Sequence, residues 1–191
     1  MKLVLIRHGE PDYSLSEGKG FKGPGRDLAP LSERGVEQAE AVALDPLLEG
    51  SQLIVSSPFT RALQTGAIIS RVTGLKLEVA FDLHEWLIDT NYENKDIYDT
   101  LAAIQDIDIH KGIRSADAKL HWEGYDQVAR RAYAALYPYL HYDQVIVTCH
   151  AYIIKQFYNP GHVKHCGIVK VDFDRDFTWP GYIEPELRGK R

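Results

Sequence analysis

The order of apolar and polar segments in this 191-residue chain predicts an α/β protein, a three-layer α/β/α sandwich with a mostly parallel central sheet. Short apolar runs typical of buried strands alternate with stretches in which apolar residues recur every three or four positions, as in amphipathic helices. Three of the apolar runs are followed at once by residues that suit the binding of an anion. Parallel strands end at the same edge of a sheet, where ligands of α/β proteins bind. We therefore expect a ligand site at that edge.

The first strand is expected at residues 3–6, an apolar run that leads into Arg7, His8 and the helix-breaking Pro11. An arginine at the mouth of a buried strand must face a cleft, water or a partner charge, because burial of an unpaired guanidinium is very unfavourable. An anionic substrate would be such a partner. The glycine-rich residues 12–30 follow as a loop, which is either a basic lid over the anion site or a plain surface connection.

The first helix is expected to begin after Ser32, whose hydroxyl can cap its first turn, and to end or kink at residues 45–46, Asp-Pro. Helical spacing of apolar residues between these points supports it. Residues 53–55 are the second short apolar run and predict the second strand.

The second helix follows this strand, with Ser57 as the expected N-cap and Pro58 as the first helical residue. Arg61 then lies in the first turn, where free N–H groups and the helix dipole favour an anion. Gly74 is expected to close the helix before a short strand at residues 75–79.

Residues 81–120 are expected to form a mostly helical excursion on one edge of the sheet and part of the pocket wall. Glu85 lies there between apolar neighbours, an environment that raises a carboxyl pKa and suits a general acid. The alternative is an ordinary salt-bridge partner. Apolar residues in three- and four-residue steps predict the longest helix at residues 121–140.

The third buried strand is expected at residues 145–149 and ends in His150. A helix follows it and is stopped by the Asn-Pro-Gly sequence of residues 159–161. The last strand is expected near residues 168–173. The polar tail, residues 174–191, is expected to pack only loosely.

Composition predicts that residues 1–191 form a single domain, because 45% hydrophobic residues can build one core. The net charge of −5 argues against nucleic acid and against an acidic membrane surface as partners, so a local cluster must bind any anion. Cys149 and Cys166 suit a reducing compartment and are expected to be free thiols, with a bridge between them as the alternative.

Targeting signals are not expected, since Met1 leads directly into a strand and no apolar run reaches the ~20 residues that span a bilayer. We therefore expect a cytoplasmic protein. The oligomeric state, a homo-oligomer included, is left open by the sequence.

Four side chains follow the ends of the three buried strands: Arg7, His8, Arg61 and His150. If the strands are parallel neighbours, these side chains converge on one edge of the sheet. Two guanidiniums can grip oxygen atoms there in a bidentate manner, and the imidazoles can donate a proton or attack. The pattern predicts a site for a phosphoryl group.

Five motifs in this order resemble the histidine phosphatase superfamily, whose fold is called phosphoglycerate mutase-like. They are Arg7-His8-Gly9-Glu10, Leu31-x-x-x-Gly35-x-x-Gln38-Ala39, Ser56-Ser57-Pro58-x-x-Arg61-Ala62-x-Gln64-Thr65, Glu85, and Thr148-Cys149-His150. The likeness runs from Leu3 to about Asp172. For the acidic position, Glu10, Glu78 and Glu93 are alternatives to Glu85.

The resemblance implies that His8 is the nucleophile that becomes phosphorylated and that Arg7, Arg61 and the catalytic His150 hold the phosphoryl oxygens. Glu85 would donate a proton to the leaving oxygen and then activate the water that hydrolyses the phosphohistidine. No metal or other cofactor is expected, because the arginines can supply the positive charge that phosphoryl transfer needs. Since two adjacent guanidiniums disfavour a third positive charge, His8 should be neutral at working pH.

Several positions depart from the family pattern. Pro11 and Ser14 stand where the family often has threonine and asparagine, so one phosphate contact is expected to be missing or remade. Ala151 and Tyr152 stand where two glycines are usual, and their side chains are expected to narrow the pocket. His165 occupies a place where asparagine is frequent.

The function expected from these observations is hydrolysis of a small phosphomonoester by a metal-independent phosphatase. Candidates for contact with the substrate are Tyr13, Lys22, Arg26, Trp86 and Tyr152. They come from the loop of residues 12–30, from the excursion and from the segment after the third buried strand.

Three other functions compete with this one. A phosphomutase would return the phosphoryl group to a substrate, although this chain is shorter than the family's mutases usually are. A non-catalytic module that binds a phosphorylated ligand would be expected to lack His8 or an arginine. A zinc hydrolase is suggested by His162-x-x-His165-Cys166, but the preceding Pro160-Gly161 and the strand-like residues after it favour a surface loop.

Overall fold

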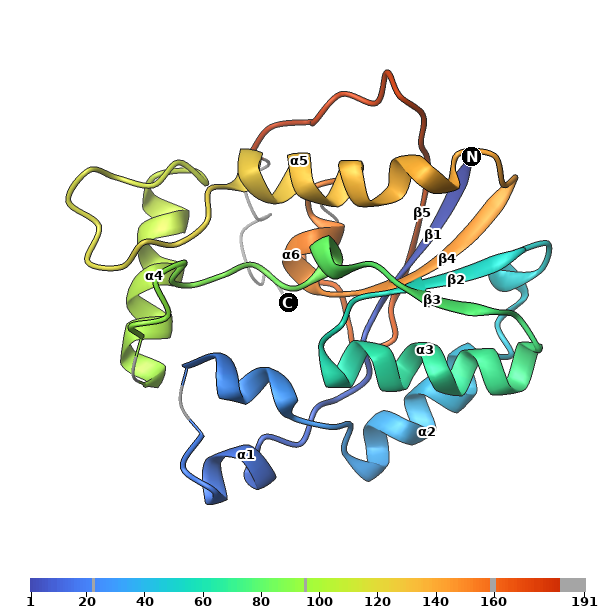
Figure 1. The fold of residues 1–191 in the computed structure, drawn as a ribbon, viewed down its shortest axis with the longest axis horizontal. Coiled ribbons are helices and arrows are strands. Elements are labelled where there is room, and N and C mark those ends of the chain that lie inside the picture. Colours follow the sequence, from blue (N-terminus) through green and yellow to red (C-terminus); the bar gives the residue numbers. More distant parts are fainter. Residues whose placement is uncertain (22, 95, 159–160, 183–191) are drawn as a thin grey trace, which may run out of the picture.

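A five-stranded sheet in the order β3-β2-β4-β1-β5 forms the centre of the computed structural model, which describes residues 1–21, 23–94, 96–158 and 161–182 (Figure 1). Neighbouring strands are parallel except for the last strand, which is antiparallel to the first. This confirms the predicted mostly parallel sheet. The strands are β1 (Lys2–Arg7), β2 (Leu53–Ser56), β3 (Leu77–Val79), β4 (Gln144–Cys149) and β5 (Ile168–Asp172).

Helices cover both faces of this sheet and complete the predicted three layers, with α2 and α3 on one face and α5 and α6 on the other (Figure 1). The helices are α1 (Ser14–Gly18), α2 (Glu33–Val42), α3 (Thr60–Thr73), α4 (Ile97–Ile109), α5 (Tyr125–Leu136) and α6 (Ala151–Ile154). None of the described helices is both long and apolar enough to cross a bilayer.

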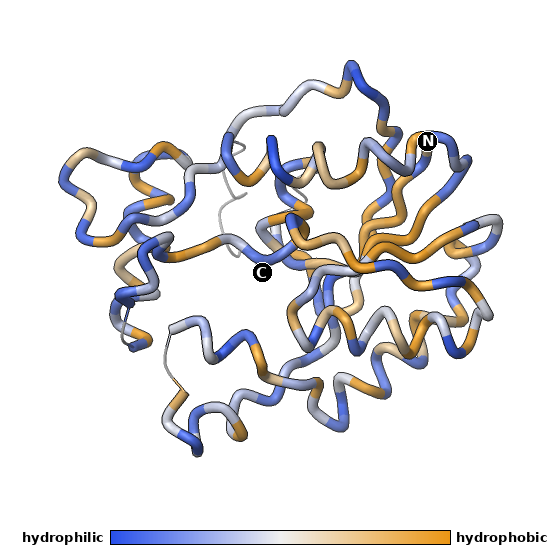
Figure 2. Tube along the Cα trace, viewed as in Figure 1, coloured by the Kyte–Doolittle hydropathy of each residue, from blue (hydrophilic) through white to orange (hydrophobic). Residues whose placement is uncertain are grey.

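The three inner strands, β1, β2 and β4, are buried on both faces, which is why they appear in the sequence as unbroken apolar runs. Leu3 and Leu5 of β1 pack in the core beneath α5, whereas Val4 and Ile6 pack in the core beside α2 and α3. Side chains alternate across a strand, so one short run supplies both cores. Figure 2 shows the strands as the most continuously hydrophobic part of the trace. Cys149, at the end of β4, is a free thiol, as was expected.

Some predicted helices are shorter than expected. Ser32 does cap α2, since its hydroxyl oxygen accepts a hydrogen bond from the Gly35 N–H at 3.0 Å. The helix expected at residues 121–140 begins only at Tyr125, because Trp122 turns into the core and the Gly124 N–H is held by the Gln127 side chain at 2.8 Å. A separate 3-10 turn follows this helix at residues 137–139.

The prediction of a mostly helical excursion at residues 81–120 was wrong, since α4 and a 3-10 turn at residues 81–83 are its only described helical segments. Aspartate side chains hold its other turns by accepting backbone N–H groups, as Asp89 does for Asn91 and Glu93. The expectation of a loosely packed tail was also wrong for residues 174–182. There Phe177 and Trp179 pack against the core, and the Trp179 indole N–H donates to the Gln156 side chain at 3.0 Å.

Two glycines bring the loop after β1 against the start of α2. A Cβ on Gly35 would lie 2.1 Å from the Glu10 carbonyl oxygen, and one on Gly9 would lie 2.5 Å from the Gly35 carbonyl oxygen. These are backbone atoms, which cannot rotate away. The loop that carries His8 therefore depends on this close approach.

We expect Gly35→Ala to lower the free energy of unfolding by about 2 kcal/mol, because the added methyl group overpacks a rigid contact. Unfolding in urea measures it. Gly18→Ala is the matched control, because its Cβ would meet nothing within 4 Å, and it should change stability by less than about 0.5 kcal/mol. Equal stability of the two variants would contradict the expectation.

Candidate functional site

Three adjacent parallel strands, β1, β4 and β2, end at one edge of the sheet and bring three of the predicted side chains together. His8 follows β1, His150 follows β4, and Arg61 lies in the first turn of α3, which comes after β2. The ring centroids of His8 and His150 are 5.2 Å apart, and Arg61 Nε donates to His8 Nε2 at 3.3 Å. All three side chains are buried. Such a cluster can bind an anion and present an imidazole to it.

The protonation state of His8 follows from its two ring contacts. Its Nδ1 lies 2.7 Å from the Gly9 carbonyl oxygen, which can only accept, so Nδ1 carries the hydrogen. Nε2 then has a lone pair. The pKa of His8 lies well below its ordinary value, first because of burial and then because of Arg61, with the Gly9 carbonyl opposing and Arg7 adding to the shift. The neutral ring expected from the sequence results more from desolvation than from the guanidiniums.

Arg7 lies at the end of β1 and is partly buried. Its Nη1 donates to the Val163 carbonyl oxygen at 2.6 Å, which holds the guanidinium beside the site. Its Nε is buried and has no hydrogen-bond partner within the described ranges. This guanidinium acts electrostatically on His8 and on Glu85, so it belongs to the same cluster.

His150 is completely buried and shares a hydrogen bond of 2.7 Å between its Nε2 and the Ser57 hydroxyl. Its Nδ1 finds no hydrogen-bond partner among the residues that the structure describes. Burial lowers the pKa of His150 well below its ordinary value, and Arg61 and His8 lower it further. The ring is therefore neutral, with one nitrogen oriented by Ser57 and the other available to a ligand.

The prediction that Ser57 caps α3 was wrong. The helix begins at Thr60 with Phe59 as the N-cap, and Pro58 precedes it in the connection from β2. The tertiary hydrogen bond from Ser57 to His150 replaces the local cap, although the Ser57 hydroxyl still accepts a long bond from the Phe59 N–H at 3.3 Å. Arg61 keeps its expected place in the first helical turn.

Asp27 also belongs to the site, although it was not among the residues predicted from the sequence. Its Oδ1 accepts from Arg61 Nη1 at 3.0 Å, and the Arg61 side chain is only 5% exposed. Burial raises the pKa of Asp27, while Arg61 opposes the rise. Asp27 lies in a 3-10 turn at residues 23–28, so the loop expected to be a basic lid also contributes a carboxylate. The loop of residues 12–30 holds three acidic and three basic residues, so no local signal distinguished Asp27.

Glu85 is partly buried, and one of its carboxylate oxygens accepts from the Trp86 backbone N–H at 2.9 Å. Burial raises the pKa of Glu85, whereas the Trp86 N–H and the nearby Arg61 and Arg7 oppose the rise. A carboxyl group with a raised pKa can hold a proton and release it to a substrate.

The three alternative glutamates lie elsewhere. Glu10 accepts from the Ser32 hydroxyl at 3.1 Å at the start of α2, and Glu78 of β3 pairs with Lys76 at 2.6 Å. Glu93 borders a separate acidic hollow near Lys119. Of these four glutamates, Glu85 is the one that lines the cavity of about 1000 Å³ described below.

Other motif residues support the loop after β1 instead of meeting a ligand. Thr65 Oγ1 accepts from the Gly9 N–H at 3.1 Å and donates to the Arg61 carbonyl oxygen at 2.8 Å. Gln38 accepts from the Glu10 N–H at 2.8 Å. These bonds tie His8 to α2 and α3, which explains why the motifs occur together.

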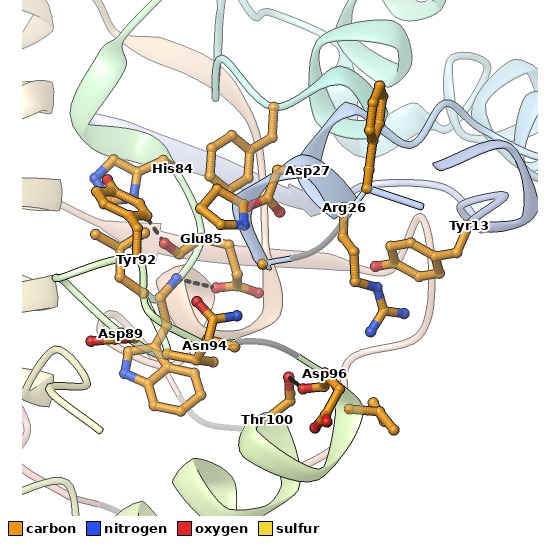
Figure 3. Close-up of a pocket in the computed structure, with 18 of the residues that line it drawn as sticks. Tyr13, Arg26, Asp27, His84, Glu85, Asp89, Tyr92, Asn94, Asp96 and Thr100 are labelled. Carbon is orange, nitrogen blue, oxygen red and sulfur yellow. Dashed lines mark hydrogen bonds between the residues drawn. The ribbon is translucent and has the colours of Figure 1, made fainter. Parts of the chain in front are cut away.

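A cavity of about 1000 Å³ opens beside this cluster, between the loop that contains α1 and the segment that leads into α4. Figure 3 shows Glu85 and Asp27 between Tyr13 and Arg26 on one side and Tyr92 on the other. Four of the five predicted substrate contacts line the cavity, namely Tyr13, Arg26, Trp86 and Tyr152. The fifth, Lys22, lies outside the described residues.

The departures from the family pattern have distinct places. Tyr152 reaches into the cavity, where its ring lies 4.9 Å from that of Trp86. Pro11 forms an isolated bridge with Leu31, away from the cavity wall. Ser14 starts α1, and its backbone N–H is held by the Asp12 side chain. The ring centroid of His165 is 5.5 Å from that of His8, so this imidazole adjoins the site.

In the described part of the chain, no three His, Cys, Asp or Glu side chains are placed so that they could bind one metal ion. In the proposed zinc motif, His162 is exposed and Cys166 is a free thiol.

Comparison with known proteins gives a consistent result. Residues 3–169 match the family model of the histidine phosphatase superfamily (branch 1). Over 107 residues the chain is 35% identical to a protein of Hydrogenobacter thermophilus named "Putative phosphoserine phosphatase 2". That match covers 56% of this chain and 50% of the relative, so the chain spans about half the length of this curated relative.

Solved structures share the fold at low sequence identity. A mycobacterial glucosyl-3-phosphoglycerate phosphatase superposes with a TM-score of 0.67 at 22% identity, over 90% of this chain and 89% of that one. The alpha-ribazole phosphatase of Shigella flexneri superposes with a TM-score of 0.66 at 19% identity, over 95% of this chain and 96% of that one. The phosphoserine phosphatase of Entamoeba histolytica, in complex with 3-phosphoglyceric acid, superposes with a TM-score of 0.61 at 22% identity, over 88% of this chain and 89% of that one.

Proposed function

This chain belongs to the histidine phosphatase superfamily (branch 1), and from that membership we propose that it hydrolyses a small-molecule phosphomonoester through a phosphohistidine formed on His8. The observation that carries the proposal is the state of His8. Its ring is neutral, its Nδ1–H is held by the Gly9 carbonyl, and its Nε2 lone pair lies among Arg61, Arg7 and His150. A neutral imidazole beside two guanidiniums is a nucleophile prepared for a phosphoryl group.

In the first step Nε2 of His8 attacks phosphorus, and the bond from phosphorus to the leaving oxygen breaks. Arg7, Arg61 and Nδ1 of His150 bind the equatorial oxygens, where negative charge is greatest. Glu85 donates its proton to the leaving oxygen. Phosphorylation makes the His8 ring cationic, and the Gly9 carbonyl at Nδ1 stabilises that charge.

In the second step Glu85, now a carboxylate, takes a proton from water as the water oxygen attacks phosphorus. The bond from phosphorus to Nε2 breaks and the neutral His8 is restored. Asp27 holds Arg61 at Nη1, so the Arg61 Nε stays directed at the site of transfer. The arginines supply the positive charge throughout, and the proposed route uses no metal.

Trapping the intermediate tests this proposal. Brief incubation with 4-nitrophenyl phosphate labelled with ³²P, followed by an alkaline quench, is expected to leave label on the protein. The bond should survive alkali and break in acid, as a phosphoramidate does. Phosphate release should equal nitrophenol release and should not change when a chelator is present.

Each competing function predicts another outcome. Loss of turnover in the chelator, with recovery on addition of zinc, would favour a zinc hydrolase. Nitrophenol release without phosphate release, when an alcohol acceptor is present, would favour a phosphomutase. Binding of phosphate without any turnover or label would favour a non-catalytic module.

A further inference from the structure

The cavity beside Glu85 is larger and more apolar than a phosphoryl group requires. We infer that the leaving group of the substrate is a bulky, uncharged and largely apolar alcohol or phenol. This inference rests on the proposed function, because it concerns the part of the ester that Glu85 protonates. It separates this chain from enzymes whose leaving group is a small charged metabolite.

The cavity adjoins the reaction site through residues that contact the cluster, although His8, Arg61 and His150 do not themselves line it. Its lining includes Glu85, Asp27 and Phe59. Asp27 bonds Arg61, and the Phe59 ring lies 5.4 Å from the His150 ring and the same distance from the Arg61 guanidinium carbon. A leaving oxygen that receives its proton from Glu85 must lie on this side of the cavity. The carbon skeleton attached to that oxygen therefore extends into the cavity.

Aromatic side chains form a large part of the cavity walls. Rings come from both sides and include Tyr13, Phe59, Phe81, Trp86, Tyr92 and Tyr152. The volume of about 1000 Å³ lies at the upper end of the ~300–1,000 Å³ of sites that enclose drug-sized ligands. The faces of these rings can bury a large apolar surface of a ligand.

Most of the described charged side chains on the walls are partnered within the protein, although the Nε of Arg26 is buried without a hydrogen-bond partner among the described residues. Arg26 pairs with Glu17 at 3.1 Å, and its guanidinium lies 4.5 Å from the centre of the Tyr13 ring. Asp89 accepts two backbone N–H groups of its own turn, and Asp96 accepts two at the start of α4. Asp27 is held by Arg61. An anionic leaving group would meet the carboxylates of Asp27, Asp89 and Asp96 and would compete with Glu17 for Arg26, whereas an uncharged one leaves these contacts intact.

Large apolar side chains are exposed at the rim of the same cavity. Phe81 is 74% exposed, Tyr92 57% and Ile97 47%, and all three line the cavity. Apolar groups gathered at the mouth of a cavity mark a binding surface. An apolar leaving group that fills the cavity would cover them and gain from their removal from water.

Three phosphate esters test the inference: 2-(2-naphthyl)ethyl phosphate, ethyl phosphate and O-phosphoserine. In all three the leaving oxygen belongs to a primary alcohol, so they differ in the group attached to that oxygen. We expect kcat/KM for the naphthylethyl ester to exceed both others by about 100-fold, because the ring system buries apolar area that the others lack. Equal or higher kcat/KM for O-phosphoserine or ethyl phosphate would overturn the inference, and the phosphohistidine route would stand.

Two exposed aromatic residues provide a matched pair of variants. Phe81→Ala should lower the ratio of kcat/KM for naphthylethyl over ethyl phosphate about fivefold, since it removes a ring from the cavity rim. Tyr98→Ala is the control, because Tyr98 is 76% exposed on α4 but does not line the cavity, and the ratio should stay the same. An equal change in both variants would count against the inference.

A failure of the proposed function would be visible separately. No turnover of any ester by the folded protein would contradict phosphohistidine catalysis. Calorimetry with the non-hydrolysable 2-(2-naphthyl)ethylphosphonate and ethylphosphonate then decides the inference alone. Tighter binding of the naphthyl compound would support an apolar leaving-group site, and equal binding would overturn it.

Discussion

Replacing His8 with alanine is expected to lower kcat for 4-nitrophenyl phosphate by at least about 10⁴-fold, because the reaction loses its nucleophile. The His165 imidazole adjoins the site, but its ring centroid lies 5.5 Å from that of His8, so it does not stand at the position of His8 Nε2. The neighbouring His150 is oriented by Ser57 through Nε2 and lies 5.2 Å away between ring centroids. The phosphate should still bind, since Arg61 and Arg7 are unchanged.

Steady-state release of nitrophenol and the ³²P label on the protein measure this effect together. Both should disappear in His8→Ala, while the protein remains folded by circular dichroism. His141→Ala is the matched control, because His141 is exposed and precedes β4, at the opposite end of that strand from His150. Its ring contacts the Pro138 carbonyl oxygen and the Tyr142 ring. Retention of more than about a tenth of wild-type kcat in His8→Ala would refute the assignment of His8 as nucleophile.

The second large effect is expected for Glu85→Gln, and its size should depend on the leaving group. For ethyl phosphate the loss in kcat should be about 10³-fold, because an alkoxide cannot leave without a proton. For 2,4-dinitrophenyl phosphate the phenolate leaves unaided, so phosphorylation of His8 should be slowed less than about tenfold. Hydrolysis of the phosphohistidine still needs the base, so one equivalent of dinitrophenolate should appear as a burst.

Rapid-mixing kinetics with both esters checks this prediction. An equal loss for the two esters and no burst would mean that Glu85 is a structural partner and not the proton donor. Glu78→Gln is the matched control, because Glu78 pairs with Lys76 on β3, outside the cavity, and its loss should leave both rates unchanged.

The pH dependence of hydrolysis follows from the directions in which the pKa values of His8 and Glu85 are shifted. The lowered pKa of His8 keeps the nucleophile neutral below pH 6.5, the ordinary value for histidine, so His8 should not limit the rate there. The raised pKa of Glu85 keeps the acid protonated above 4.5, and ethyl phosphate hydrolysis should fall as pH rises through that raised pKa. Glu85→Gln should remove this alkaline fall.

The raised pKa of Glu85 also makes the stability of the fold depend on pH. Because the folded protein binds the Glu85 proton more tightly than the unfolded chain does, its favourable contribution is complete below pH 4.5 and is lost as pH rises through the folded pKa. Relative to wild type, Glu85→Gln should therefore gain stability as pH is raised above 4.5. The pKa of Glu78 is lowered by Lys76, so the change in stability has the opposite sign. Relative to wild type, Glu78→Gln should lose stability as pH is raised through that lowered pKa toward 4.5.

The structure also shows where local rules fail. Ser57 followed by Pro58 has the sequence of a helix N-cap, yet its hydroxyl bonds His150 instead, 93 residues away in the chain. Asp27 has no periodic pattern around it, and its partner Arg61 is 34 residues away. Such pairs depend on which elements become neighbours, and a local pattern contains no information on that.

The sequence alone determined the parallel sheet and the meeting of His8, Arg61 and His150, because each follows a short apolar run and parallel strands end at one edge. Only the tertiary structure decided the main cause of the neutral state of His8 and the shape of the cavity. The first depends on burial, which comes from all the elements packed around the ring. The second depends on irregular segments, held by side-chain contacts such as those of Asp89 and Arg26, which lack the repeating spacing that identifies a helix or a strand.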